Sequence, residues 1–178
     1  AHGQHKVQDW FIGTTAERVV SKSDRPVLVT RQKAEGPYRE VVLGVDFSSL
    51  GQTAIRMACQ LAAADARFTL VHIYELWFEP RLAESDLTHA VHDRIVAQEE
   101  QRLLDELKAF ARSVGLAERH VHFEIRQGYP GPGLLHIARE RNADLIACGT
   151  HGMSGVQYVL LGSVAQHVLR QAHCDVLI

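Results

Sequence analysis

The sequence predicts a doubly wound α/β fold built on a five-stranded parallel sheet. Apolar, β-branched runs such as Glu40–Asp46 alternate along the chain with amphipathic helical segments. These runs lack the polar–apolar alternation of a half-exposed strand, which indicates strands covered on both faces. Parallel neighbours need crossover connections, and the helical segments supply them. Residues 38–178 accommodate five such strands.

The first strand, Glu40–Asp46, precedes a helix that Ser48 or Ser49 can cap and that extends to Ala66. The other expected elements are, in order, a strand at Arg67–Tyr74, a helix from about Asp86 to Ser113, a strand at Val121–Arg126, a helix from Gly133 to Arg141, a strand at Asp144–Gly149, a helix from about Ser163 to Gln171, and a strand at Asp175–Ile178. The long helix has an apolar face with a 3.6-residue period that we expect to pack on the sheet: Val91, Ile95, Leu103, Leu104, Leu107 and Phe110.

Composition excludes several classes of protein. A formal net charge of −2, from 19 basic and 21 acidic residues, creates no field that would attract nucleic acid or an anionic membrane. The cysteines Cys59, Cys148 and Cys174 form no CxxC pair, which argues against a disulfide framework or a zinc ribbon. No apolar run approaches the ~18 residues that span a bilayer, and the first residues lack the features of a signal peptide. We therefore expect a cytoplasmic protein.

The first 30 residues repeat the end of the chain without a gap. His2 aligns with His151, and the same offset gives nine identities: His2, Gly3, Val7, Gln8, Gly13, Ala16, Val19, Val27 and Leu28 match His151, Gly152, Val156, Gln157, Gly162, Ala165, Val168, Val176 and Leu177. A repeat at domain length indicates duplication, because solenoid periods are only about 20–50 residues. We interpret residues 1–31 as the C-terminal remnant of an upstream copy, 32–38 as a linker and 39–178 as the main domain.

Two segments follow strands at the edge of the sheet where open α/β folds bind ligands. Val45-Asp46-Phe47-Ser48 ends the first strand, and Gly149 begins a glycine-rich loop that reaches Gly162-Ser163. Glycines let a backbone approach a phosphate, and the N–H groups at a helix N-terminus attract anions. The hydroxyl of Ser163 can cap that helix or donate to a phosphate oxygen. The pattern predicts a nucleotide site.

The arrangement Gly149-x2-Gly152-x9-Gly162-Ser163 resembles the signature of the ATP-binding branch of the universal stress protein family. Similar features are the Val45–Ser48 segment, Leu70-Val-His-Ile73, the Gly128-x-Pro130 turn and Ala143–Gly149. The resemblance covers the chain from about Arg39 to the end, and residues 1–30 carry it again. It implies a Rossmann-like fold of the adenine nucleotide alpha hydrolase type and a tandem-domain protein.

By this resemblance, the expected cofactor is ATP, with Mg²⁺ as a candidate accompanying ion. The residues expected at the nucleotide are Asp46, Phe47, Ser48, Ile73, Cys148, Gly149, His151, Gly152, Gly162, Ser163, Val164 and Ala165. Adenine is expected near Asp46 and Ile73, and the phosphates along the glycines and Ser163. Cys148 is expected to pack against the nucleotide without reacting. Ala165 stands where the family sometimes carries Thr, so one hydroxyl for a phosphate is missing.

Other chemistries have less support. No Gly-Lys-Ser/Thr follows the loop and no GxGxxG opens the first helix, which argues against a P-loop and a dinucleotide site. The pairs His89/His92 and His120/His122 could bind zinc only with further ligands nearby, and surface histidines explain them more simply. His151 can contact phosphate or face solvent. Asp46 without a second acid or a nucleophile favours a ligand or cap over a catalytic base.

The predicted function is that of an ATP-binding regulator or sensor in a stress response, without efficient catalysis and without a metal site. The alternatives are an interaction module of the same fold that does not use nucleotide, and a slow ATPase. The expected partners are an adenine nucleotide and either the chain's own upstream domain or a second subunit, joined through last strands. We expect Pro26–Thr30 to lie antiparallel beside Asp175–Ile178, because such pairing protects both exposed strand edges.

Overall fold

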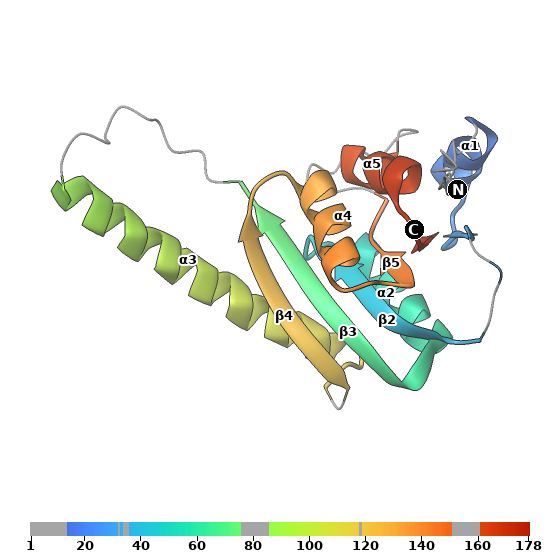
Figure 1. Ribbon diagram of the computed structural model, residues 1–178, viewed down its shortest axis with the longest axis horizontal. Coiled ribbons are helices and arrows are strands. Elements are labelled where there is room, and N and C mark those ends of the chain that lie inside the picture. The colour runs from blue at the N-terminus through green and yellow to red at the C-terminus, as the bar shows by residue number, and fades with distance from the viewer. Residues whose placement is uncertain (1–13, 32, 34–35, 76–85, 118, 151–160) are drawn as a thin grey trace, which may run out of the picture.

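The computed structural model describes residues 14–31, 33, 36–75, 86–117, 119–150 and 161–178, and within them six strands form one sheet in the order β1-β6-β5-β2-β3-β4 (Figure 1). The strands are β1 (Leu28–Val29), β2 (Tyr38–Gly44), β3 (Ala62–Tyr74), β4 (His120–Gln127), β5 (Leu145–Ala147) and β6 (Asp175–Leu177). The helices are α1 (Thr14–Lys22), α2 (Ser49–Leu61), α3 (Asp86–Ser113), α4 (Pro130–Glu140) and α5 (Ser163–Gln171). Strands β2 to β6 pair in parallel, which confirms the predicted doubly wound fold, and β1 adds an antiparallel edge.

The helices cover both faces of the sheet, as the apolar strands require. Helices α1, α4 and α5 pack on one face, where Val20, Leu135 and Leu169 join one buried cluster. Helices α2 and α3 pack on the other, where Ile55, Leu107 and strand residues form a second cluster. Burial on both sides explains why β2 and β5 are continuous apolar runs in the sequence.

The predicted boundary between α2 and β3 is wrong. The alanine-rich segment up to Ala66 was expected to be helical, but α2 ends at Leu61 and β3 begins at Ala62. Ala62 has extended dihedral angles and pairs with Tyr38, and Ala63 and Ala66 are buried in the cluster beneath α2 and α3. Strand pairing and burial here override the high helix propensity of alanine.

Helix α4 starts three residues earlier than its predicted start at Gly133. Pro130 occupies its first turn, where proline needs no N–H partner and already has a helical φ. Gly128, with φ of +144°, makes the turn from β4 into the helix. The proline that was assigned to the turn therefore begins the helix.

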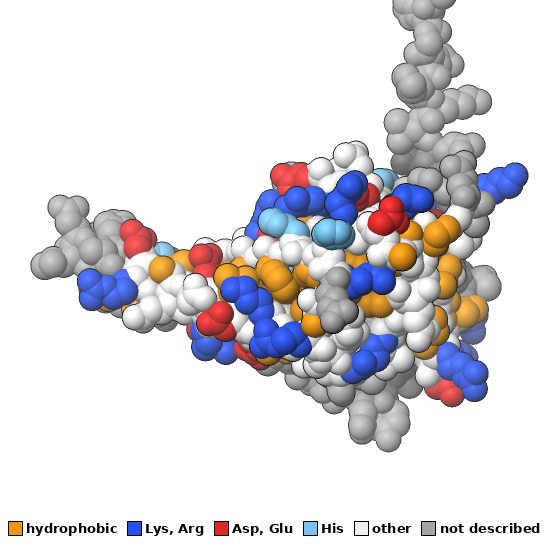
Figure 2. All heavy atoms as spheres, turned by 90° about the horizontal axis from the view of Figure 1, so that it is seen from below, with side chains coloured by type: hydrophobic (Ala, Val, Ile, Leu, Met, Phe, Trp, Pro, Cys, Tyr) orange, Lys and Arg blue, Asp and Glu red, His pale blue; other side chains and the backbone are white. Residues whose placement is uncertain are grey.

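Helix α3 has its predicted bounds, but only its C-terminal half packs on the sheet. Leu107 is fully buried and Phe110 is 8% exposed, whereas Val91 and Ile95 are 56% and 42% exposed. Figure 1 shows the N-terminal half of α3 projecting beyond the strands. In the space-filling view of Figure 2 the same end of the molecule forms a narrow extension at the left. The expectation that the whole apolar face packs on the sheet is therefore wrong, because the helix is longer than the sheet edge it crosses.

Strand β1 lies antiparallel beside β6, as predicted, with Leu28 opposite Leu177 and Val29 opposite Val176. Backbone hydrogen bonds in both directions join Val27 and Ile178, at 2.7 and 3.0 Å. The buried Asp175 then holds both ends of the segment between β1 and β2, residues 31–38. Its carboxylate accepts hydrogen bonds from the Arg31 amide, at 2.6 Å, and from the Tyr38 hydroxyl, at 2.7 Å.

The hydroxyl of Tyr38 makes this attachment sensitive to alkaline pH. Burial, and then the hydrogen bond to Asp175, raise the Tyr38 pKa above its ordinary value of about 10. A raised folded-state pKa stabilises the fold fully below pH ~10, and this contribution is lost as pH rises through the folded pKa. Tyr38→Phe should therefore lower the free energy of unfolding by about 1 kcal/mol at pH 7.

The difference between the parent and Tyr38→Phe should shrink above pH ~10, since the phenylalanine has no proton to lose. Urea unfolding of both proteins at neutral and alkaline pH measures it. Burial and Glu100 also raise the pKa of Tyr74, but that group is common to both proteins and cancels. A difference that is constant with pH would contradict the assignment to Tyr38.

Candidate nucleotide pocket

A cavity of about 260 Å³ opens at the carboxyl ends of β2, β3 and β5, between the N-termini of α4 and α5. The chain runs from β2 through β3 to β4 on one side of the sheet. It then crosses to the other side of β2, where it forms β5 and β6. The cavity therefore lies where the strand order reverses, which is where open α/β sheets bind ligands. It is lined by Gly44, Val45, Asp46, Val71, His72, Ile73, Pro130, Leu134, Cys148, Gly149, Thr150, Gly162, Ser163, Val164 and Ala165.

Asp46 stands at the end of β2 in a turn that holds its carboxylate. Its Oδ1 accepts hydrogen bonds from the amide of Ser48, at 2.9 Å, and from the Ser48 hydroxyl, at 2.7 Å. The Ser48 oxygen in turn accepts a bond from the Gly51 amide and caps α2. Both bonds fix one carboxylate oxygen and so orient Asp46 at the cavity wall. Ser48 acts as the predicted cap and does not line the cavity.

Phe47 has a φ of +59°, which is uncommon for a bulky residue. Its ring lies against His72, with centroids 4.6 Å apart, and meets the edge of Phe110 at 6.2 Å. The aromatic contacts offset the backbone strain and hold the ring on the face covered by α3. Phe47 therefore packs against the buried cluster beneath α2 and α3 and does not line the cavity.

The N-terminus of α5 forms the polar wall. Gly162 is the N-cap residue and no side chain caps the helix, so of the two alternatives for Ser163 the capping role is not observed. The Gly162 amide donates to the Thr150 carbonyl at 2.8 Å, which ties the helix start to the loop after β5. The amides of Ser163, Val164 and Ala165 have no acceptor within the helix. Together with the helix dipole they favour an anion.

The opposite wall is apolar. Ile73 and Val71 of β3, Pro130 and Leu134 of α4, and Cys148 line it. A Cβ on Gly44 would lie 2.8 Å from Leu134 and 3.3 Å from the Cβ of Cys148, so a larger residue at the end of β2 would displace the wall. An apolar pocket with a few polar groups at one end is typical of small-molecule sites.

Burial, and then the Asp46 carboxylate, raise the pKa of the Cys148 thiol to about 12. The thiol is therefore protonated at pH 8, and only the thiolate is nucleophilic. We expect iodoacetamide to label Cys148 at least ~100-fold more slowly in the folded protein than in urea. Peptide mass mapping of the labelled protein measures the two rates. Rapid labelling of Cys148 in the folded state would show that the wall is open or differently charged.

The cavity brings together eight of the residues predicted from the sequence: Asp46, Ile73, Cys148, Gly149, Gly162, Ser163, Val164 and Ala165. His151 and Gly152 lie outside the described residues. Pro130, Leu134 and His72 were not predicted as site residues. The Gly128-x-Pro130 turn indicated the position of Pro130, but nothing in the local sequence around Leu134 shows that α4 reaches the cavity.

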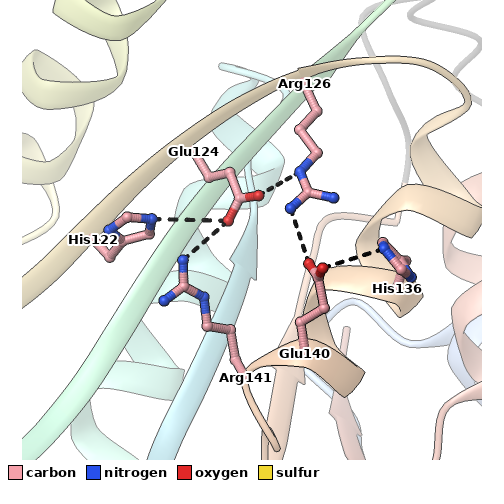
Figure 3. A network of polar contacts seen from close by, with 6 residues as sticks. All are labelled: His122, Glu124, Arg126, His136, Glu140 and Arg141. Atoms are coloured by element: carbon pink, nitrogen blue, oxygen red, sulfur yellow. Dashed lines mark hydrogen bonds and ion pairs between the residues drawn. The ribbon is translucent and has the colours of Figure 1, made fainter.

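Helix α4 is held against the edge strand β4 by an ion-pair network (Figure 3). Glu124 of β4 contacts Arg126 and, at 3.5 Å, Arg141. Glu140 of α4 lies 2.9 Å from Arg126 and 3.4 Å from His136. Links at the C-terminal end of α4 help to fix the helix whose first turns line the cavity.

The histidine pairs considered as zinc ligands have different surroundings. His122 lies 3.9 Å from Glu124 within that network, and His120 is exposed. Over the described ranges, no three His, Cys, Asp or Glu side chains come together as a metal site. His89 belongs to the part of α3 whose side chains the structure does not describe. Of the described helices, none has both the length and the hydropathy to cross a membrane.

The fold and the pocket define a doubly wound α/β protein with a helix N-terminus at the strand-order reversal. The model of the universal stress protein family matches residues 37–178, and the chain belongs to this family. It is 32% identical over 141 residues to the universal stress protein Rv1636 of Mycobacterium tuberculosis, which covers 79% of this chain and 95% of that protein.

Two solved structures illustrate the similarity. A crystal structure of a universal stress protein in complex with cAMP is 29% identical, with a TM-score of 0.54, over 80% of this chain and 97% of that one. The functionally unknown protein PA1789 from Pseudomonas aeruginosa PAO1 is 18% identical, with a TM-score of 0.70, over 99% of this chain and 59% of that one. The second similarity concerns the fold alone.

Proposed function

We propose that the pocket binds ATP and that the protein acts as a nucleotide-dependent regulator or sensor in a stress response. The observation that carries the proposal is the juxtaposition of an apolar wall around Ile73 and Leu134 with the N-terminus of α5. The apolar wall suits a purine, and the amides of Ser163 to Ala165 suit phosphate oxygens. The cAMP complex of a similar protein supports an adenine nucleotide as the ligand class.

The proposed role is binding without efficient turnover. The titratable side chains among the described lining residues are Asp46, His72 and Cys148. One Asp46 oxygen is held by Ser48, the Cys148 thiol is protonated, and Nδ1 of His72 contacts the Val45 carbonyl. None of these groups is paired with a second one as an acid–base or nucleophile–base couple. Mg²⁺ would be held mainly by the phosphates of the nucleotide, with the free Asp46 oxygen as a candidate ligand.

Calorimetric titration with ATP, ADP, cAMP and adenosine, each with Mg²⁺, tests the proposal. If the α5 N-terminus binds phosphate, ATP should bind at least ~10-fold more tightly than adenosine, with cAMP revealing any preference for a cyclic phosphate. Equal affinity for adenosine and ATP would contradict the phosphate role of α5. Absence of binding by every ligand would favour an interaction module, and steady phosphate release from bound ATP would favour the slow ATPase.

We further propose that residues 1–31 are the last helix and strand of an upstream copy. The nine identities with the chain's own end, the antiparallel pairing of β1 with β6 and the contact of α1 with the α5 side of the sheet support this. Similarity in fold over 99% of this chain but 59% of a longer protein is consistent with it. The pairing would then join two copies within one tandem protein.

A further inference from the structure

We propose that His72 is a positioning residue that holds the turn carrying Asp46 in its ligand-ready geometry. His72 lies on β3, one residue before Ile73 of the apolar wall, and neither the motif nor the resemblance assigns it a role. Its Nδ1 is 2.7 Å from the carbonyl oxygen of Val45, the residue before Asp46. A carbonyl oxygen only accepts hydrogen bonds, so Nδ1 must carry the proton.

The contact extends the pairing between β2 and β3 by one residue beyond the end of β2. The Val45 amide donates to the Val71 carbonyl at 2.8 Å, and the Val45 carbonyl accepts from His72. Both backbone groups of Val45 are therefore held by adjacent residues of one strand. The direction in which the chain leaves β2, and hence the position of Asp46, depends on these two bonds.

The same ring also supports the strained residue of the turn. Phe47, at φ +59°, packs on the His72 ring at a tilt of 40°. A bulky side chain persists in this region only when its surroundings compensate for the strain. His72 thus acts on both sides of Asp46, through a hydrogen bond before it and a ring contact after it.

Amide hydrogen exchange of Ser48 reports on the turn in the ligand-free protein, because this amide donates to Asp46 Oδ1. His72→Leu should accelerate the exchange about tenfold, since it removes the donor. His72→Asn should recover most of the protection, to within about threefold of the parent, because its amide nitrogen stands at the same bond distance from Cβ as Nδ1. The remaining difference reflects the lost ring contact with Phe47. Should the leucine variant not fold, His72→Gln, whose amide nitrogen corresponds to Nε2, replaces it.

Phe110→Leu is the matched control for general loosening, because Phe110 packs on Phe47 but its ring carries no group that could hydrogen-bond to Val45. It should lower thermal stability while leaving Ser48 exchange within about twofold of the parent. Equal acceleration in Phe110→Leu, equal exchange in His72→Asn and His72→Leu, or no acceleration in any variant would overturn the positioning role.

The consequence for binding rests on the proposed ATP function. His72→Leu should weaken ATP binding about fivefold to tenfold, and His72→Asn should restore it to within about twofold. A parent that binds no nucleotide would refute the proposed function, while the exchange measurement would still decide the role of His72. If His72→Leu binds ATP as tightly as the parent does, the positioning role is refuted and the proposed ATP function is not.

Discussion

Ser163→Asp is expected to remove most of the affinity for ATP without destabilising the protein. The residue occupies the first turn of α5 and lines the cavity beside the amides that have no acceptor within the helix. A carboxylate there interacts favourably with the helix dipole, by about 0.3–1 kcal/mol. The same charge ~4 Å from a phosphate costs about 1–4 kcal/mol, depending on the local dielectric. ATP should therefore bind on the order of 10–100-fold more weakly, while the unfolding midpoint stays equal or rises.

Ser163→Asn is the matched control, because it has nearly the same shape without the charge. Ser163→Asn should bind ATP with an affinity within a few-fold of the parent's. Any loss of affinity relative to the parent should not depend on the salt concentration. The loss in Ser163→Asp should shrink in high salt, because exposed charges are screened. Calorimetric titration and urea unfolding of the three proteins measure both effects. If Ser163→Asp binds ATP as the parent does, the phosphates do not lie at α5.

Deletion of residues 1–36 is expected to lower stability and to produce a dimer. Val20 is 2% exposed and belongs to the buried cluster with α4 and α5, and Val27 and Val29 pack against that cluster. Losing these contacts should cost about 3 kcal/mol or more of unfolding free energy, at ~1.5–3 kcal/mol for a fully buried valine. The deletion also leaves β6 with an open edge, which invites pairing with a second copy.

Val27→Pro in the intact chain provides the graded comparison. It removes the amide that donates to the Ile178 carbonyl, so it should cost about 1 kcal/mol while β1 still covers the edge. Sedimentation equilibrium should then show a monomer for this variant and a dimer for the truncated chain at the same concentration. A truncated chain that stays monomeric and as stable as the parent would mean that residues 14–31 neither stabilise the domain nor protect the edge of β6.

The sequence was sufficient to predict the fold class because each buried strand is a continuous apolar run and the helical periods between them are clear. The bounds of α3 and α5 agree with the prediction for this reason. The errors arise where tertiary contacts decide. Ala62 belongs to a strand because Tyr38 pairs with it, and Val91 is exposed because α3 outruns the sheet.

The same distinction applies to the pocket. Asp46, Gly149 and Gly162 were predictable because turn chemistry and glycine spacing are local signals. Leu134 and His72 were not, because their roles depend on which strands are neighbours and on where α4 lies over the sheet. In the amino-acid sequence, Leu134 has the pattern of an ordinary core residue of an amphipathic helix.

We propose that an adenine nucleotide occupies this cavity with its phosphates at the start of α5. Mapping of backbone amide chemical shifts during titration with Mg²⁺ and ATP tests it most directly. We predict the largest shifts at Ser163, Val164 and Ala165, with further shifts at Asp46 and Ile73 and little change at the exposed Ile95 of α3. Saturable shifts that cluster on β4 or α3 and leave the α5 amides unchanged would contradict this placement of the nucleotide.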